Sequence, residues 1–190
     1  MNMAVLGFML ITWLGAAQVF ASTPTEQIQE TIQQVLVAVD SSSPGSESDR
    51  RARLRHALMP RFDWPEMAKQ ALGKHWNGVI DRQDEFIAAF ADFLGNAYVG
   101  RIESYKDEKI LFMHESIERN SAQVDTKIVP GKGEPTSVNY RLHRVRDEWK
   151  IYDVVVEDIS IIGNYRSQFD RIITRGSFDD LLKRMRQKSL

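Results

Sequence analysis

The apolar residues of this chain recur at helical spacing up to about residue 105 and alternate with polar residues from residue 108 to residue 156. Near the start, Thr23 occupies an N-cap position, Pro24 the first helical position, and Glu26 follows the cap by three residues, the arrangement of a capping box. The predicted helix carries one apolar stripe made of Ile28, Ile32, Val35, Leu36 and Val39. We therefore expect a first helix that ends near residue 40.

Three more helices are predicted before the spacing changes. The first runs from about Asp49 to Met59, and the second is capped by Asp63 and stopped by Gly73. The third is capped by Asp81, extends to about residue 105, and carries an apolar, largely aromatic face made of Phe86, Ala89, Phe90, Phe93, Ala97 and Tyr98. Core packing explains such a face, and the wall of a cavity is the functional alternative.

Two glycines, Gly95 and Gly100, interrupt the longest predicted helix. A glycine inside a helix costs about 1 kcal/mol relative to alanine. We expect a close approach of another group to the backbone, or a bend, as the reason for them.

Alternating apolar and polar residues predict four β-strands joined by short turns, within residues 108–115, 123–128, 138–143 and 149–156. Such strands form an antiparallel meander, and the helices that precede them indicate an α+β fold. The fourth strand, WKIYDVVV, is rich in β-branched residues and is expected to be a central strand covered on both faces. Further helices are predicted from Asn164 to Gly176 and after a cap at Ser177.

The inward face of the fourth strand depends on its register. Either Tyr152, Val154 and Val156, or Ile151 and Val155, lie beside Tyr140 on the third strand. A shift of one residue moves every side chain of a strand to the opposite face. The pattern alone leaves both alternatives open.

Composition narrows the function classes. The chain has 190 residues, which suits one domain with a substantial core, and its net charge of -1 makes nucleic acid an unexpected partner. It has no cysteine, which excludes a disulfide scaffold, a thiolate metal site and a cysteine nucleophile.

Residues 1–21 have the pattern of a signal peptide. An apolar run from Ala4 to Ala17 is too short for a comfortable membrane span, and Val19-Phe20-Ala21 is similar to a cleavage site. We expect cleavage after residue 21 and a single domain over residues 22–190. Because no lysine or arginine precedes the apolar run, a retained N-terminal anchor is the alternative.

Catalytic motifs are absent from the sequence. There is no G-x-S-x-G, H-E-x-x-H or G-x-x-x-x-G-K-[ST], and the four histidines are scattered, so neither a hydrolase nor a metal site is expected. Asp153 is the one candidate base, because it is a carboxylate between apolar residues such as Ile151 and Val154. A structural carboxylate, hydrogen-bonded to a neighbouring strand or loop, is the favoured alternative.

Four stretches carry a resemblance to a known family: ALGKHW at 71–76, YRL at 140–142, WKIYDVVVE at 149–157 and NYRSQF at 164–169. With them, the chain resembles the MlaC family, also called the toluene-tolerance or phospholipid-transport periplasmic family, over roughly residues 62–182. The resemblance implies a curved antiparallel sheet of four to five strands, similar to nuclear-transport-factor-2-like folds and wrapped by N- and C-terminal helices around an apolar cavity.

The function implied by the resemblance is that of a periplasmic shuttle. It would bind a glycerophospholipid with the acyl chains buried and the headgroup near solvent. The implied partners are an outer-membrane lipoprotein complex and an inner-membrane ABC transporter with an MCE-type subunit, and the implied role is maintenance of outer-membrane lipid asymmetry. The family is not enzymatic, so no catalytic residue and no cofactor carries over. A monomer is the simplest expectation.

The predicted pocket combines the aromatic helix, the third and fourth strands and the segment that follows them. Its expected wall is Phe90, Phe93, Leu94, Tyr98, Tyr140, Leu142, Tyr152, Val154, Val156, Tyr165 and Phe169. Asn164 and Arg166 are expected at the cavity mouth or near the headgroup.

Three alternatives stay open. The cargo is another apolar lipid such as a hopanoid; or the chain is a cavity enzyme of the isomerase or dehydratase type with Asp153 as base; or it is a docking protein. In the last case, the basic stretches Arg50–Arg55 and Lys183–Lys188 would bind acidic partners.

Overall fold

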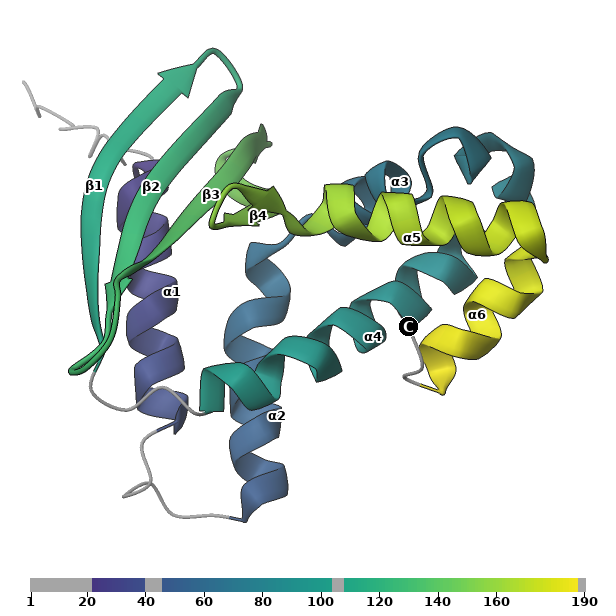
Figure 1. The fold of residues 1–190 in the computed structure, drawn as a ribbon. Helices are drawn as coiled ribbons and strands as arrows, with labels where there is room; N and C mark the ends of the chain where they lie inside the picture. Colours follow the sequence, from purple (N-terminus) through teal and green to yellow (C-terminus); the bar gives the residue numbers. More distant parts are fainter. Residues whose placement is uncertain (1–21, 40–45, 104–107, 188–190) are drawn as a thin grey trace, which may run out of the picture.

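A curved, five-stranded antiparallel sheet holds one helix in its concave side and joins a separate group of helices through β4 and α5 (Figure 1). The computed structural model describes residues 22–39, 46–103 and 108–187. The predicted signal peptide, residues 1–21, lies outside the described residues. None of the helices in the described ranges combines the length and the apolar content that a bilayer crossing requires.

The helices and strands follow one another as the spacing of apolar residues predicts, with a helical first half, a meander and two final helices. Their bounds are α1 (Pro24–Val39), α2 (Glu47–Leu58), the 3₁₀ helix η1 (Met59–Arg61), α3 (Trp64–Leu72), the 3₁₀ helix η2 (Gly73–Arg82), α4 (Gln83–Glu103), β1 (Lys109–Glu118), β2 (Ser121–Val129), β3 (Thr136–Val145), β4 (Glu148–Val156), β5 (Ile159–Ser160), α5 (Ile161–Arg175) and α6 (Phe178–Arg186). The α+β fold class is confirmed.

Three predicted caps are confirmed. Thr23 and Glu26 form a reciprocal box, in which the Glu26 amide donates to Thr23 Oγ1 over 3.1 Å and the Thr23 amide donates to Glu26 Oε2 over 2.8 Å. Asp63 accepts the Glu66 amide at the start of α3, and Ser177 caps α6. These short-range bonds satisfy amides that a helix leaves free at its first turn.

Other predicted boundaries are wrong, because local caps and turns decide them. Helix α2 begins after Ser46, which forms its own capping box, and α4 begins at Gln83, after the η2 helix, instead of at Asp81. Helix α5 begins at Ile161, three residues before Asn164, because Ser160 Oγ accepts the Gly163 amide over 2.8 Å. A good N-cap outweighs the strand preference of isoleucines.

Two β-bulges set which side chains share the concave face. Between β3 and β4, Arg141 pairs with Asp153 and Leu142 pairs with Ile151, so Tyr152 is the extra residue. A similar shift at Met113 interrupts β1. The bulge places Ile151 on the same face as Val154 and Val156. The cavity face of β4 therefore takes one residue from one predicted register and two from the other.

Strand β4 is the fourth of five strands and not the central one, which is β3. Both faces of β4 are nevertheless covered, because Trp149, Ile151, Asp153 and Val155 are all buried. The concave face is held against α1 by two long-range bonds: the Trp149 amide donates to Gln27 Oε1 over 2.9 Å, and the Thr25 amide to Glu115 Oε2 over 2.7 Å. The opposite face of β4 meets α3 and α5.

The buried apolar residues divide into two clusters. The larger joins α3, α4, α5 and α6 around Phe86, Phe90 and Phe169, each fully buried. The smaller lies between α1 and the sheet and consists of Ile28, Ala122, Val124, Leu142, Trp149 and Ile151. Helix α4 extends beyond the larger cluster toward the sheet side (Figure 1).

Candidate functional site

A cavity of about 330 Å³ lies between the concave face of the sheet and α1, α2 and α4. Its volume is within the range of small-molecule sites. The lining is mainly apolar and consists of Ile28, Thr31, Ile32, Val35, Leu36, Val39, Arg55, Leu58, Met59, Phe62, Trp64, Met67, Leu94, Gly95, Tyr98, Ile102, Glu108, Ile110, Ile128, Thr136, Val138, Tyr140, Ile151, Val154, Val156 and Ile161. Such a surface suits an apolar ligand.

The sheet wall of the cavity follows from the strand register. Val138 pairs with Val156, and Tyr140 pairs with Val154. Residues directly opposite in an antiparallel pair project to the same side, so these four side chains form one patch. All four line the cavity.

The helical wall opposite the sheet includes the whole predicted apolar stripe of α1, namely Ile28, Ile32, Val35, Leu36 and Val39. We expected this stripe on the first helix but did not include it in the predicted pocket. One feature of the sequence could have indicated a cavity wall: the stripe continues to the end of the helix, farther than a small core requires. Leu36 remains 48% exposed in the folded chain, as a cavity wall allows and a filled core does not.

The cavity lining includes five of the eleven predicted pocket residues: Leu94, Tyr98, Tyr140, Val154 and Val156. The other six lie elsewhere. Phe90, Phe93, Tyr165 and Phe169 pack together in the helical cluster, Leu142 is buried in the sheet-side cluster, and Tyr152 lies beside His143 with ring centroids 5.4 Å apart. Contact of any of the eleven with a ligand stays a prediction.

Asn164 and Arg166, the predicted mouth residues, are exposed on α5 and do not appear in the cavity lining. The aliphatic part of Arg166 lies against Gly73, where a Cβ would come within 3.1 Å of Arg166 Cδ. Gly73 also has a φ of 53°, which favours glycine. This close contact joins α5 to the end of α3.

Asp153 is buried on the face of β4 that is turned away from the cavity. Its Oδ2 accepts from Arg141 Nη1 over 3.2 Å and from Ser160 Oγ over 2.7 Å, while Oδ1 accepts the Ile162 amide over 3.1 Å. Three donors and no cavity exposure describe a structural carboxylate that holds β4 to the start of α5. This geometry does not suit a base acting on a ligand in the cavity.

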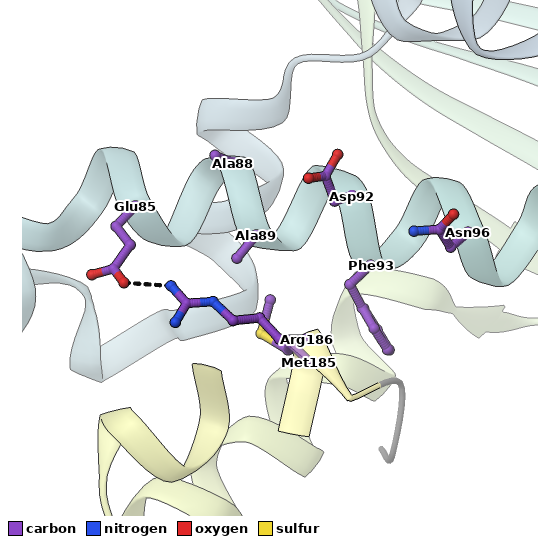
Figure 2. A pocket seen from close by; sticks show the side chains of 8 residues that line it. All are labelled: Glu85, Ala88, Ala89, Asp92, Phe93, Asn96, Met185 and Arg186. Atoms are coloured by element: carbon purple, nitrogen blue, oxygen red, sulfur yellow. Dashed lines mark hydrogen bonds and ion pairs between the residues drawn. The ribbon is translucent and has the colours of Figure 1, made fainter. Parts of the chain in front are cut away.

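A second hollow, of about 440 Å³, is an open surface groove between α4 and α6 (Figure 2). Half of its lining is polar or charged: Glu85, Asp92, Asn96 and Arg186. Arg186 Nη2 donates to Glu85 Oε1 over 2.6 Å, and the guanidinium of Arg82, followed by that of Arg186, lowers the pKa of Glu85. Because half of the groove lining is polar or charged and the cavity lining is mainly apolar, we regard the apolar cavity as the candidate site.

Acidic and histidine side chains do not gather into a metal site in the part of the chain that the structure describes. Each of the two histidine–carboxylate contacts among the described residues involves a single histidine, and Asp170 also pairs with Lys74 Nζ over 2.8 Å. His75 Nε2 lies 2.7 Å from Asp170, and His143 Nε2 lies 2.8 Å from Asp63. Both contacts join separate segments, and none of the four residues is part of the cavity lining.

Comparisons with known proteins agree with this geometry. The family model described as MlaC protein matches residues 26–187. The chain is 20% identical, over 97% of its length and 91% of the other protein, to the "Intermembrane phospholipid transport system binding protein MlaC" of Haemophilus influenzae. A phospholipid-binding protein from Ralstonia solanacearum, solved in complex with a phospholipid, has a similar fold, with a TM-score of 0.75 and 18% identity over 88% of this chain and 97% of that one. Because the family match covers most of the sequence, the chain belongs to the MlaC family, whose members are binding and transport proteins.

Proposed function

We propose that the protein is a periplasmic carrier that buries the acyl chains of a glycerophospholipid and shuttles it between the two membranes. The observation that carries this proposal is the apolar cavity between the sheet and α1, α2 and α4. Family membership supports it, as do the printed name of the Haemophilus influenzae relative and the phospholipid in the Ralstonia solanacearum complex.

The size of the hydrophobic effect explains the need for such a carrier. At about 0.8 kcal/mol per buried methylene, two acyl chains with ~30 methylenes face a gross cost of ~24 kcal/mol to cross water unaided. A cavity lined by leucine, isoleucine, valine and aromatic side chains replaces the bilayer interior. Exchange between a membrane complex and the carrier is then nearly isoenergetic, whereas escape into water is not, and no catalytic group is required.

The proposal includes a location and partners. Residues 1–21 would direct export to the periplasm and be removed there, leaving residues 22–190 as one lipid-binding domain. An inner-membrane MCE-type ABC transporter and an outer-membrane lipoprotein complex would exchange lipid with it and so maintain outer-membrane lipid asymmetry. We propose that the carrier works as a monomer without a cofactor.

Lipid extraction from the protein purified without detergent tests the function. We expect a near-stoichiometric glycerophospholipid by mass spectrometry, and uptake of labelled phospholipid from vesicles by the delipidated chain. Absence of both would contradict the proposal. A hopanoid or another apolar lipid in the extract would retain the carrier but replace its cargo.

A further inference from the structure

Arg55 is the only basic side chain among the described residues that line the apolar cavity. It projects from α2 and forms an ion pair with Asp92 on α4. The side chain of Arg55 is 41% exposed and that of Asp92 is 63% exposed. The guanidinium therefore lies where the apolar cavity meets water, which is also where the polar part of an amphipathic ligand must lie.

The glycine at position 95 explains how this guanidinium fits against α4. A Cβ built on Gly95 would lie 3.3 Å from Arg55 Nη1, closer than ordinary van der Waals contact. Without a side chain at that position, the planar guanidinium lies close to the helix. The cost of a glycine inside α4, about 1 kcal/mol relative to alanine, thus has a local reason at the cavity boundary.

Asp92 pairs with this guanidinium but is not part of the cavity lining. It also lines the outer groove, and Figure 2 shows its carboxylate pointing away from Met185 and Arg186. A carboxylate and a phosphodiester both offer anionic oxygens to the same fork of N–H donors. An exposed ion pair is worth only about 0.2–1 kcal/mol, so one anion replaces the other at little cost.

We propose that Arg55 binds the phosphodiester of the cargo, and that Asp92 holds Arg55 in place until a phosphate oxygen replaces it. The inference rests on the proposed function, since it requires a glycerophospholipid in the cavity. It assigns the headgroup end of the ligand to the gap between α2 and α4. Neither Asn164 nor Arg166 takes part.

The competing interpretation is a structural latch, in which the pair only ties α2 to α4. The two interpretations predict different effects of removing the Asp92 carboxylate. If the pair is a latch, removal of either partner breaks it equally. If Asp92 competes with the ligand for Arg55, its removal strengthens ligand binding. Two variants and two ligands therefore separate them.

The experiment measures dissociation constants for phosphatidylglycerol and for a diacylglycerol with the same acyl chains. We expect Arg55→Gln to weaken phosphatidylglycerol binding about three- to tenfold and to change diacylglycerol binding less than about twofold. Asp92→Asn is expected to tighten phosphatidylglycerol binding by about 1.4- to fivefold. Arg51→Gln is the matched control, because Arg51 is an exposed α2 arginine paired with Glu47 and outside the cavity lining.

Some results would overturn the assignment. Phosphatidylglycerol binding that is unchanged in Arg55→Gln removes Arg55 from headgroup recognition. Equal weakening of both ligands by Arg55→Gln and by Asp92→Asn identifies a latch. If the wild-type chain binds neither ligand, the proposed carrier function itself fails, and that result is distinct from the other two. A thermal melt of each variant verifies that it is folded.

Discussion

The two ends of α4 border interiors of different kinds. In its first turns, Phe86 and Phe90 stack with ring centroids 5.6 Å apart, and Phe169 of α5 meets both edge-on at 5.9 Å. In its later turns, Leu94 and Tyr98 line the cavity under the sheet. One helix thus serves a filled core and a hollow one within about ten residues.

The difference between these regions comes from what faces the helix. Around the first turns, α3 and α6 pack against α4, and the Phe169 ring of α5 lies against Phe86 and Phe90. Farther along, α4 faces a curved sheet whose concave side is filled only in part by α1. Apolar side chains therefore form a filled core where α4 meets other helices and leave room for a ligand where α4 faces the sheet.

The largest effect expected from this difference is on the free energy of unfolding, and alanine substitutions of two leucines test it. Leu72 is 2% exposed inside the filled cluster; Leu94 is 4% exposed, belongs to the same cluster and also lines the cavity. We expect Leu72→Ala to lower the free energy of unfolding by about 4–5 kcal/mol, because it creates a new void. Leu94→Ala should cost about 2.5–3 kcal/mol, because it only widens an existing one.

Urea denaturation of the delipidated variants measures both values. The two substitutions delete the same atoms from similarly buried sites, so each is the control for the other. Equal costs would mean that the cavity closes in solution, and the contrast between the two regions would disappear.

A smaller effect is expected when the cavity is filled. Val154→Phe projects a ring into the space for lipid. If the ring displaces two methylenes of an acyl chain, binding weakens by about 1.6 kcal/mol, roughly fifteenfold, while the free energy of unfolding changes by less than about 1 kcal/mol. Fluorescent-lipid titration and denaturation measure the two quantities separately.

Ala68→Leu is the matched change in the filled cluster, where Ala68 is fully buried. Overpacking there should cost about 1–3 kcal/mol of stability and leave the lipid affinity of the folded protein unchanged. If Val154→Phe proves as destabilising as Ala68→Leu and has no effect on lipid binding, Val154 is packed and is not a cavity wall.

The smallest expected effect concerns pH and the helical region alone. The ammonium of Lys74, followed by His75, lowers the pKa of Asp170 from its ordinary value of 3.8 to about 2. Because the folded pKa is lowered, the ionised carboxylate stabilises the fold above about pH 4, and this contribution is lost as the pH falls toward 2. Asp170→Asn should therefore flatten the pH dependence of stability between pH 4 and 2, most clearly at low salt.

Thermal melts from pH 2 to pH 6 measure this dependence. Lys74→Met, which removes the main cause of the shift, should reproduce part of the flattening. A wild-type pH profile in Asp170→Asn would contradict the assignment. Lipid affinity at neutral pH should be unaffected in either variant, since both residues lie outside the cavity lining.

Much of the fold was predictable from the sequence because its signals are local. The capping box at Thr23 and Glu26 and the caps at Asp63 and Ser177 act within three residues. Alternation identified four of the five strands and their meander order. The predicted start of α5 was wrong because Ile161 and Ile162, which follow the cap Ser160, have a strand preference although they are helical.

The site was less predictable, because several of its features depend on contacts between distant segments. The bulge at Tyr152 turns that side chain away from Val154 and Val156, and nothing adjacent to it in the sequence signals the extra residue. Phe90 and Phe93 resemble a cavity wall by composition, but α5 and α6 fill the space beside them. The α1 stripe resembles core and lines the cavity instead.

The sequence by itself predicted the α-helices, four of the five strands, their order and the family to which the chain belongs, because capping, periodicity and short motifs act over a few residues. Only the tertiary structure decided which apolar surfaces meet with a gap between them. It also brought Arg55 of α2 to Gly95 and Asp92 of α4. Packing between elements far apart in the chain depends on the shapes of both partners at once, and no local pattern in either one records the space that remains.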